Sequence, residues 1–168
     1  MQDLVRNGAN SKFFIINCID PRSGANTIFN ADPGQIFATR VMAALVPAYQ
    51  PGKSDNFSAS LKYAIETKKV EHLIIMGHTQ CGGIEALVKG TKDNDIAGWV
   101  DVAHDAYDRA KLKVGDTDQN ALLRETERQA VILGLKNLLS YPVVRDAFVQ
   151  GKITLNGWLF DMEHGKLM

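Results

Sequence analysis

The chain has only two cysteines among its 168 residues, and its 19 lysines and arginines are balanced by 19 aspartates and glutamates. Two cysteines cannot supply the several disulfides that staple small secreted domains. A net charge of zero provides no overall field to attract nucleic acid or an anionic membrane. No apolar run is long enough to cross a membrane, and the first residues do not form a secretory segment. These absences predict a cytoplasmic protein that acts on a small or neutral molecule, with no nucleic acid or membrane partner.

Apolar runs alternate with amphipathic segments along the chain, without internal repeats or low-complexity stretches. Short apolar runs predict buried strands at residues 13–17, 36–39, 73–76 and 153–160, the last being the final strand. Helical spacing of apolar residues predicts helices at 58–67 and 125–139, a helix start at 84–88, and a stop or kink at Pro142. This alternation predicts an α/β fold, with a mostly parallel central sheet flanked by helices, in a single domain over residues 1–168.

Both cysteines lie in polar motifs at the carboxyl ends of predicted strands. Cys18 begins the motif Cys18-Ile19-Asp20-Pro21-Arg22, and Cys81 ends the motif His78-Thr79-Gln80-Cys81. Ligands of parallel sheets bind beyond the carboxyl ends of the strands, so these side chains are expected to meet. Two thiolates and one imidazole are three zinc ligands, and three protein ligands leave the open fourth position of a catalytic site. The sequence therefore predicts one zinc ion per chain.

Each of these residues also has an ordinary interpretation. A lone cysteine is more often a small buried hydrophobe, and the pair Cys18 and Cys81 could instead form a disulfide. Their placement together with a histidine favours the metal. The remaining histidines, His72, His104 and His164, are predicted to be solvated residues without a role in the site.

Charged residues accompany the first cysteine. Asp20 and Arg22 could form an ordinary surface ion pair. Beside a metal, Arg22 would instead keep Asp20 ionised, so that Asp20 accepts a proton from metal-bound water or enters the open position as a fourth ligand. Arg40, at the end of the second predicted strand, is either an anion contact or a structural arginine.

Taken together, these residues resemble the β-class carbonic anhydrases. The resemblance runs from about Lys12 to Leu167. It includes Cys18-x-Asp20-x-Arg22, the segment 32–40, His78-x-x-Cys81-Gly82-Gly83, and the segment 157–161. The paired cysteine and histidine motifs are the specific part of the resemblance, and the other two segments support it.

The resemblance implies a function for each matching residue. Cys18, His78 and Cys81 would bind zinc, and Asp20 and Arg22 would form a catalytic dyad. Gly82 and Gly83 would contact the substrate. The implied reaction is that of a lyase, the reversible hydration of carbon dioxide to bicarbonate with zinc hydroxide as the nucleophile. The family also implies a homodimer, or a dimer of dimers forming a homotetramer, with active sites at the subunit interface.

The sequence departs from the family pattern at several positions. Pro21 stands where serine is usual, and Val41–Ala44 replaces a segment that carries two asparagines. Proline lacks a backbone donor and restricts the residue before it, so the dyad could be re-aimed. One subgroup has an inhibitory bicarbonate pocket of tryptophan, arginine and tyrosine. The matching residues here are Ile15, Arg40 and Phe160, which predicts that this pocket is absent.

Three alternative functions remain open at this stage. The chain could be a noncatalytic protein that keeps zinc for folding or regulation after the changes at Pro21 and Val41–Ala44. It could also hydrolyse carbonyl sulfide or carbon disulfide at the same zinc site. A thiol redox protein is the least favoured, because the two cysteines lack Cys-x-x-Cys spacing.

Overall fold

A five-stranded sheet with strand order β2-β1-β3-β4-β5 forms the centre of the computed structural model, which describes residues 1–168. Its strands are β1 (Phe13–Cys18), β2 (Ile36–Val41), β3 (His72–His78), β4 (Thr154–Asp161) and β5 (Lys166–Leu167). Neighbouring strands among the first four run parallel, and β5 runs antiparallel to β4. The mostly parallel α/β sheet is confirmed. The strand predicted at residues 153–160 is present as β4, but it is not the final strand, because the chain turns at Gly165 (φ 62°) and adds β5.

Eight α-helices surround or extend this sheet. They are α1 (Gln2–Asn7), α2 (Ala25–Ile28), α3 (Asn56–Lys62), α4 (Gly82–Lys89), α5 (Asn94–Val100), α6 (His104–Val114), α7 (Gln119–Leu138) and α8 (Pro142–Val149). The three predicted helices correspond to α3 with a following π-helical turn, α4 and α7. Helix α7 begins at Gln119, where Asp118 caps it by accepting hydrogen bonds from two backbone amides. None of the helices has the length and apolar character needed to span a membrane.

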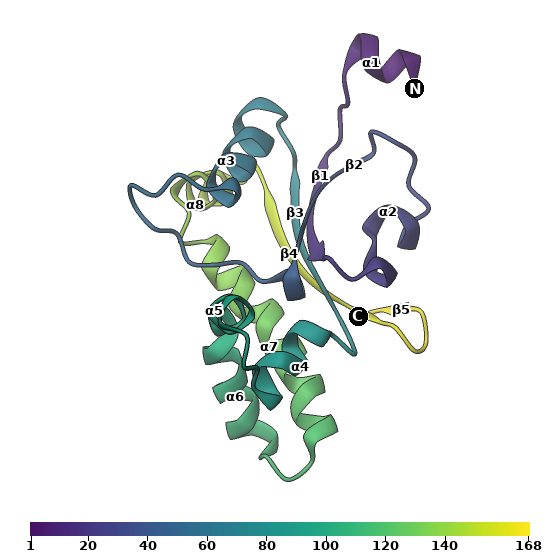
Figure 1. Ribbon diagram of the computed structural model, residues 1–168. Coiled ribbons are helices and arrows are strands. Elements are labelled where there is room, and N and C mark those ends of the chain that lie inside the picture. The colour runs from purple at the N-terminus through teal and green to yellow at the C-terminus, as the bar shows by residue number, and fades with distance from the viewer.

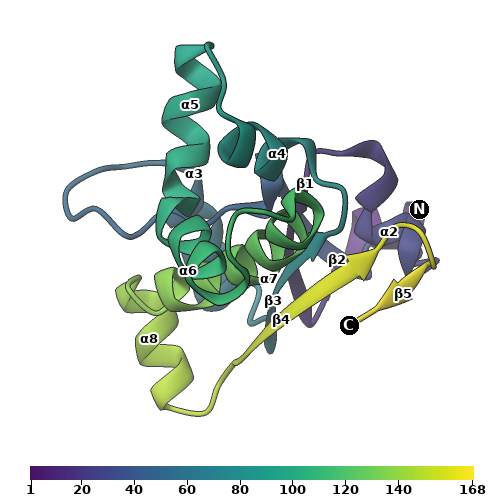
Figure 2. The same ribbon diagram turned by 90° about the horizontal axis from the view of Figure 1, so that it is seen from below.

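The two faces of the sheet are covered unequally. Phe14 and Ile16 of β1 belong to a large apolar cluster, which also includes side chains of α3, α7 and α8. Ile15, between them, faces the other way into a small cluster with Ala25 of α2. Figures 1 and 2 show α3, α7 and α8 on one side of the sheet and α2 on the other. Helices α6 and α7 lie side by side and reach past the carboxyl ends of β1 and β3 (Figure 1).

Helix α7 packs against the sheet through glycines. A Cβ atom on Gly77 of β3 would lie 2.7 Å from Val131 of α7, and one on Gly157 of β4 would lie 2.8 Å from the same valine. On the helix, a Cβ atom on Gly134 would lie 2.8 Å from Ile75. These distances leave no room for a methyl group, so α7 approaches β3 and β4 as closely as it does because glycine occupies all three positions.

Adding a methyl group at this contact is expected to destabilise the fold. Gly157→Ala should lower the free energy of unfolding by about 1–3 kcal/mol, because Val131 and Leu135 must move. Gly98 of α5 is the matched control, since a Cβ atom there meets nothing within 4 Å. Gly98→Ala should raise stability by up to about 1 kcal/mol through helix propensity. Urea denaturation measures both changes, and equal effects of the two substitutions would contradict the packing argument.

Candidate metal centre

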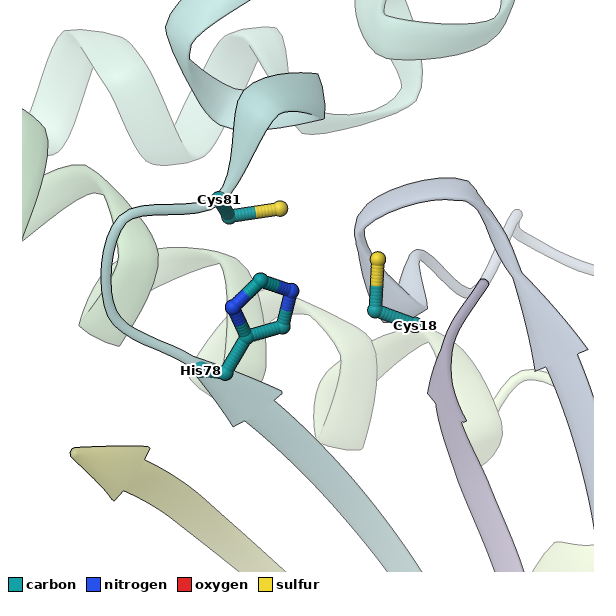
Figure 3. Close-up of side chains that lie close together, drawn as sticks. All are labelled: Cys18, His78 and Cys81. Carbon is teal, nitrogen blue, oxygen red and sulfur yellow. The ribbon is translucent and has the colours of Figure 1, made fainter. Parts of the chain in front are cut away.

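Cys18, His78 and Cys81 come together at the carboxyl edge of the sheet. Cys18 is the last residue of β1, His78 is the last residue of β3, and Cys81 precedes the first turn of α4. Their ligand atoms all lie within 4.8 Å of one another, and the residues are 4%, 2% and 3% exposed. In Figure 3 the two sulfur atoms and the imidazole ring face a common space. The structure thus brings together the three residues that the sequence singled out.

The donor atoms of this cluster fit a metal ion. Nδ1 of His78 hydrogen-bonds the carbonyl oxygen of Thr79 at 2.9 Å, which selects the tautomer with a free Nε2. That Nε2 is buried and has no hydrogen-bond partner. Both cysteines are free thiols, so the alternative of a disulfide is not realised. A buried imidazole nitrogen without a partner beside two thiols is the donor set that a zinc-type cation satisfies.

The two thiols influence each other's protonation. The neighbouring thiol of Cys81 lowers the pKa of Cys18, in opposition to burial, which raises it. The same interaction, together with burial, raises the pKa of Cys81. The pair therefore favours one thiolate and one thiol. A divalent cation would favour the second thiolate as well, because metal binding displaces thiol protons.

The loop between His78 and Cys81 is attached to the strand next to it and to α7. The backbone amide of Thr79 donates to Phe160 of β4 at 2.9 Å, and Thr79 Oγ1 accepts from the amide of Met162 at 2.9 Å. Gln80 has a φ of 57°, in the left-handed region that non-glycine residues seldom adopt. The backbone amide of Cys81 donates to Oε1 of Glu127 at 3.0 Å.

Pro21 is compatible with the pair of charged residues on either side of it. Asp20 caps a short 3₁₀ turn (Pro21–Ser23), and Pro21 occupies its first position, where a missing backbone donor costs least. Oδ1 of Asp20 accepts from the backbone amide of Arg22 at 2.9 Å and from its Nε at 3.0 Å. Oδ2 accepts from Nη2 of Arg22 at 2.7 Å. The side-chain hydrogen bonds from Arg22 lower the pKa of Asp20 to about 2, against its partial burial.

Arg40 holds the same loop from the neighbouring strand. Its Nε donates to the carbonyl oxygen of Cys18 at 2.9 Å, and its Nη2 donates to that of Asp20 at 2.6 Å. Ser23 and Asn17, both fully buried, add further hydrogen bonds to the loop. These bonds give Arg40 a structural role, which is one of the two alternatives that the sequence left open, and its anion contact remains untested.

The glycines after Cys81 have different surroundings. A Cβ atom on Gly82 would meet nothing within 4 Å, whereas one on Gly83 would lie 2.9 Å from Cβ of Ala43. Ala43 and Ala44 adopt positive φ values of 58° and 55°. Gly83 therefore allows α4 to begin directly against this turn. The predicted substrate contacts of both glycines remain untested.

The other histidines lie outside the metal cluster, as predicted. His72, at the opposite end of β3 from His78, pairs with Thr154 at 2.8 Å. His104 lies near two aspartates at the start of α6, and His164 pairs with Asp161 at 2.8 Å in the turn before β5. Asp161 raises the pKa of His164, which is fully exposed.

Sequence reasoning missed Glu127, although its position carried a signal. Glu127 precedes Ala130 and Val131 by three and four residues, so it lies on the apolar face of α7. The side chain is 1% exposed, and its pKa is raised to about 6 by burial. A carboxylate on the buried stripe of a helix indicates a specific partner, which here is the backbone of Cys81.

Comparisons with known proteins agree with this arrangement. The family model described as carbonic anhydrase matches residues 13–167. β carbonic anhydrase 3 of Arabidopsis thaliana is 34% identical over 160 residues, which are 92% of this chain and 62% of that protein. β carbonic anhydrase 5 of the same plant, named as chloroplastic, is 30% identical over 89% of this chain and 51% of its own length. The chain thus spans about half to two thirds of these relatives.

Solved structures show the same fold. The β-carbonic anhydrase CcaA superposes with a TM-score of 0.92 over 99% of this chain and 82% of its own, at 22% identity. A tetrameric β-carbonic anhydrase of Sordaria macrospora gives a TM-score of 0.87 at 26% identity, with 100% of this chain and 84% of its own covered. With the family model matched over nearly all its residues and the fold shared, this chain belongs to the β-class carbonic anhydrases.

Proposed function

We propose that this chain binds one zinc ion through Cys18, His78 and Cys81 and catalyses the reversible hydration of carbon dioxide to bicarbonate. The observation that carries the proposal is the buried Cys-His-Cys cluster with an aspartate–arginine pair directly beside it. Family membership supports the reaction class.

The metal would supply the nucleophile and the protein would orient it. Zinc with three protein ligands lowers the pKa of a bound water to about 7, which makes hydroxide available near neutral pH. His78 keeps Nε2 unprotonated for the metal because its Nδ1 is committed to Thr79. The thiolates of Cys18 and Cys81, both residues being nearly buried, would hold the cation.

Asp20 would accept the hydrogen bond that orients the nucleophile. Oδ1 of Asp20 already accepts two hydrogen bonds from Arg22, whereas Oδ2 accepts one and keeps a lone pair for the reacting group. With a pKa of about 2, Asp20 stays ionised throughout the neutral range. Asp20 is not among the residues whose ligand atoms cluster, which favours its role as a hydrogen-bond acceptor over that of a fourth ligand.

A second copy of the chain would complete the site. Ile19, next to Cys18, is 57% exposed, and it lines a shallow apolar hollow with Met42 and Trp99. Strand β2 beside this hollow is an edge strand of the sheet. We infer that a partner subunit covers this surface and encloses the carbon dioxide pocket. The Sordaria macrospora relative is a tetramer, which supports a dimer or a dimer of dimers.

The alternatives differ in what they predict for catalysis. A noncatalytic zinc protein is less favoured than the sequence suggested, because Pro21 fits its turn and the Asp20–Arg22 pair is formed. Hydrolysis of carbonyl sulfide or carbon disulfide would use the same cluster, so measured rates with each substrate must distinguish these reactions.

A cytoplasmic location remains a prediction, since one relative is named as chloroplastic.

Zinc binding should require the histidine at the carboxyl end of β3 and not the histidine at its amino end. We expect the wild type to retain one zinc per chain, and His78→Ala or Cys81→Ser to lose it, because each substitution removes a ligand. His72→Ala, at the other end of the same strand, is the matched control and should keep the metal. Zinc content after gel filtration, with circular dichroism as a test of folding, gives the answer. Equal zinc loss in the His72 and His78 variants would contradict the assignment.

Hydration of carbon dioxide should be rapid and dependent on zinc. Stopped-flow assays from about pH 6.5 to 9 span the expected titration of the zinc-bound water, with chelator-treated protein as the blank. Asp20→Asn should keep zinc and lose activity by about 100-fold, the range of a lost proton-accepting group. Asp93→Asn is the control, because Asp93 also caps a helix but lies at α5. A zinc-loaded wild type without a rate above the blank would favour the noncatalytic protein or another small substrate.

The subunit interface can be tested with a single charge. Ile19→Asp should shift the protein from dimer towards monomer, because a carboxylate would be buried in the apolar contact. Leu112→Asp is the control, since Leu112 is 88% exposed and lies on α6. Sedimentation velocity at several concentrations distinguishes the species. A monomeric wild type, or equal sedimentation of both variants, would remove Ile19 from the interface.

A further inference from the structure

Glu127 is a buried carboxylate that the proposed reaction does not use. Its Oε1 accepts a hydrogen bond from the backbone amide of Cys81 at 3.0 Å and forms an ion pair with Nη2 of Arg124 at 2.8 Å. Its Oε2 is buried and has no hydrogen-bond partner. A buried carboxylate that leaves one oxygen unpaired is unfavourable by itself, so its retention on the apolar face of α7 calls for a specific cause.

The ion pair with Arg124 does not provide that cause. Arg124 lies on the same helix three residues earlier, and its side chain is 31% exposed. A pair within one helix contributes little and does not require a buried partner. The contact that Glu127 makes across elements is the one with Cys81, which joins α7 to the start of α4.

The loop that Glu127 contacts needs an external support. Gln80 is held at a φ of 57°, a conformation that costs a non-glycine residue energy and that the loop would leave if it were free. The backbone amide of Thr79 is already attached to Phe160 of β4, and its side chain to Met162, the residue that follows β4. The hydrogen bond to Cys81 attaches the other end of the loop, so that His78 and Cys81 are held on both sides of the strained residue.

We propose that Glu127 is a positioning residue of the metal centre, whose Oε1 holds the Gln80–Cys81 peptide so that the Cys81 thiolate and the His78 imidazole stand ready for one metal ion. This inference rests on the proposed metal site. Groups that orient metal ligands by hydrogen bonds contribute to metal affinity, and their removal lowers that affinity by about 10- to 100-fold.

The test measures metal affinity and the ligand field in four variants. Zn²⁺ affinity is obtained by competition with a chromophoric chelator, and the absorption of the Co²⁺-loaded protein reports the geometry of the thiolate ligands. Glu127→Gln keeps an oxygen acceptor at the same reach and loses the charge, and should bind within about threefold of the wild type. Glu127→Asp keeps the charge but is one methylene too short, and should lose about 10- to 100-fold in affinity, with an altered Co²⁺ spectrum.

Two further variants separate positioning from ion pairing. Arg124→Gln removes the ion pair and should leave the affinity for Zn²⁺ unchanged. Glu125→Gln is the matched control on α7, because Glu125 is also buried and pairs with Lys113 and Arg128, away from the metal loop. It should alter stability and leave the Co²⁺ spectrum unchanged.

The order of the Zn²⁺ affinities of the variants tests the positioning role of Glu127. Binding by Glu127→Gln that is tighter than binding by Glu127→Asp supports positioning through the hydrogen bond. The reverse order, or equal affinity of all variants and the wild type, overturns it. A wild type that binds neither Zn²⁺ nor Co²⁺ would instead refute the proposed metal site, so the two failures are distinguishable.

Discussion

The parallel pairing of β1 with β3 is the constraint on which the metal cluster depends. Cys18 and His78 are far apart in the sequence, and they meet because the two strands lie side by side and end at the same edge. The register pairs Asn17 with Met76. Cys18 is therefore one residue beyond this pair on β1, and His78 is two residues beyond it on β3. Both faces of these strands are buried, and a shift of one residue would move every apolar side chain to the opposite face. Because the two faces pack against different clusters, the core favours the observed register, and that register brings the candidate ligands together.

The features that the sequence predicted are those with a local signal. Apolar runs mark the parallel strands, and the ligand motifs directly follow them. The bounds of helix α6 were not predicted, because it contains few apolar residues and is supported by packing against α7. Strand β5 was missed because two residues paired with β4 alone leave no periodic pattern. The hydrogen bonds of Arg40 and Glu127 join distant segments, so the sequence can indicate that Glu127 is buried but not which group either residue contacts.

The residues that depart from the family pattern fit the local backbone of this chain. Pro21 occupies the position of its turn that does not require a donor, and Asp20 still accepts from Arg22. Ala43 and Ala44 keep a left-handed turn that costs alanine about 1–2 kcal/mol per residue. Trp99 supports this turn by donating to the carbonyl oxygen of Met42 at 2.9 Å. The left-handed turn against α4 is thus formed here by two alanines, which bring no polar side chains to the site.

Helix α7 connects the stability of the fold to the geometry of the metal centre. Val131 packs against Gly77 and Gly157, and Glu127 lies one turn earlier on the same face. The distance between α7 and the sheet at Val131 therefore affects whether Oε1 of Glu127 reaches the backbone amide of Cys81. His78, immediately after Gly77, is carried by the same strand. The candidate ligand His78 and the carboxylate that contacts Cys81 are thus both linked to one contact between a helix and the sheet.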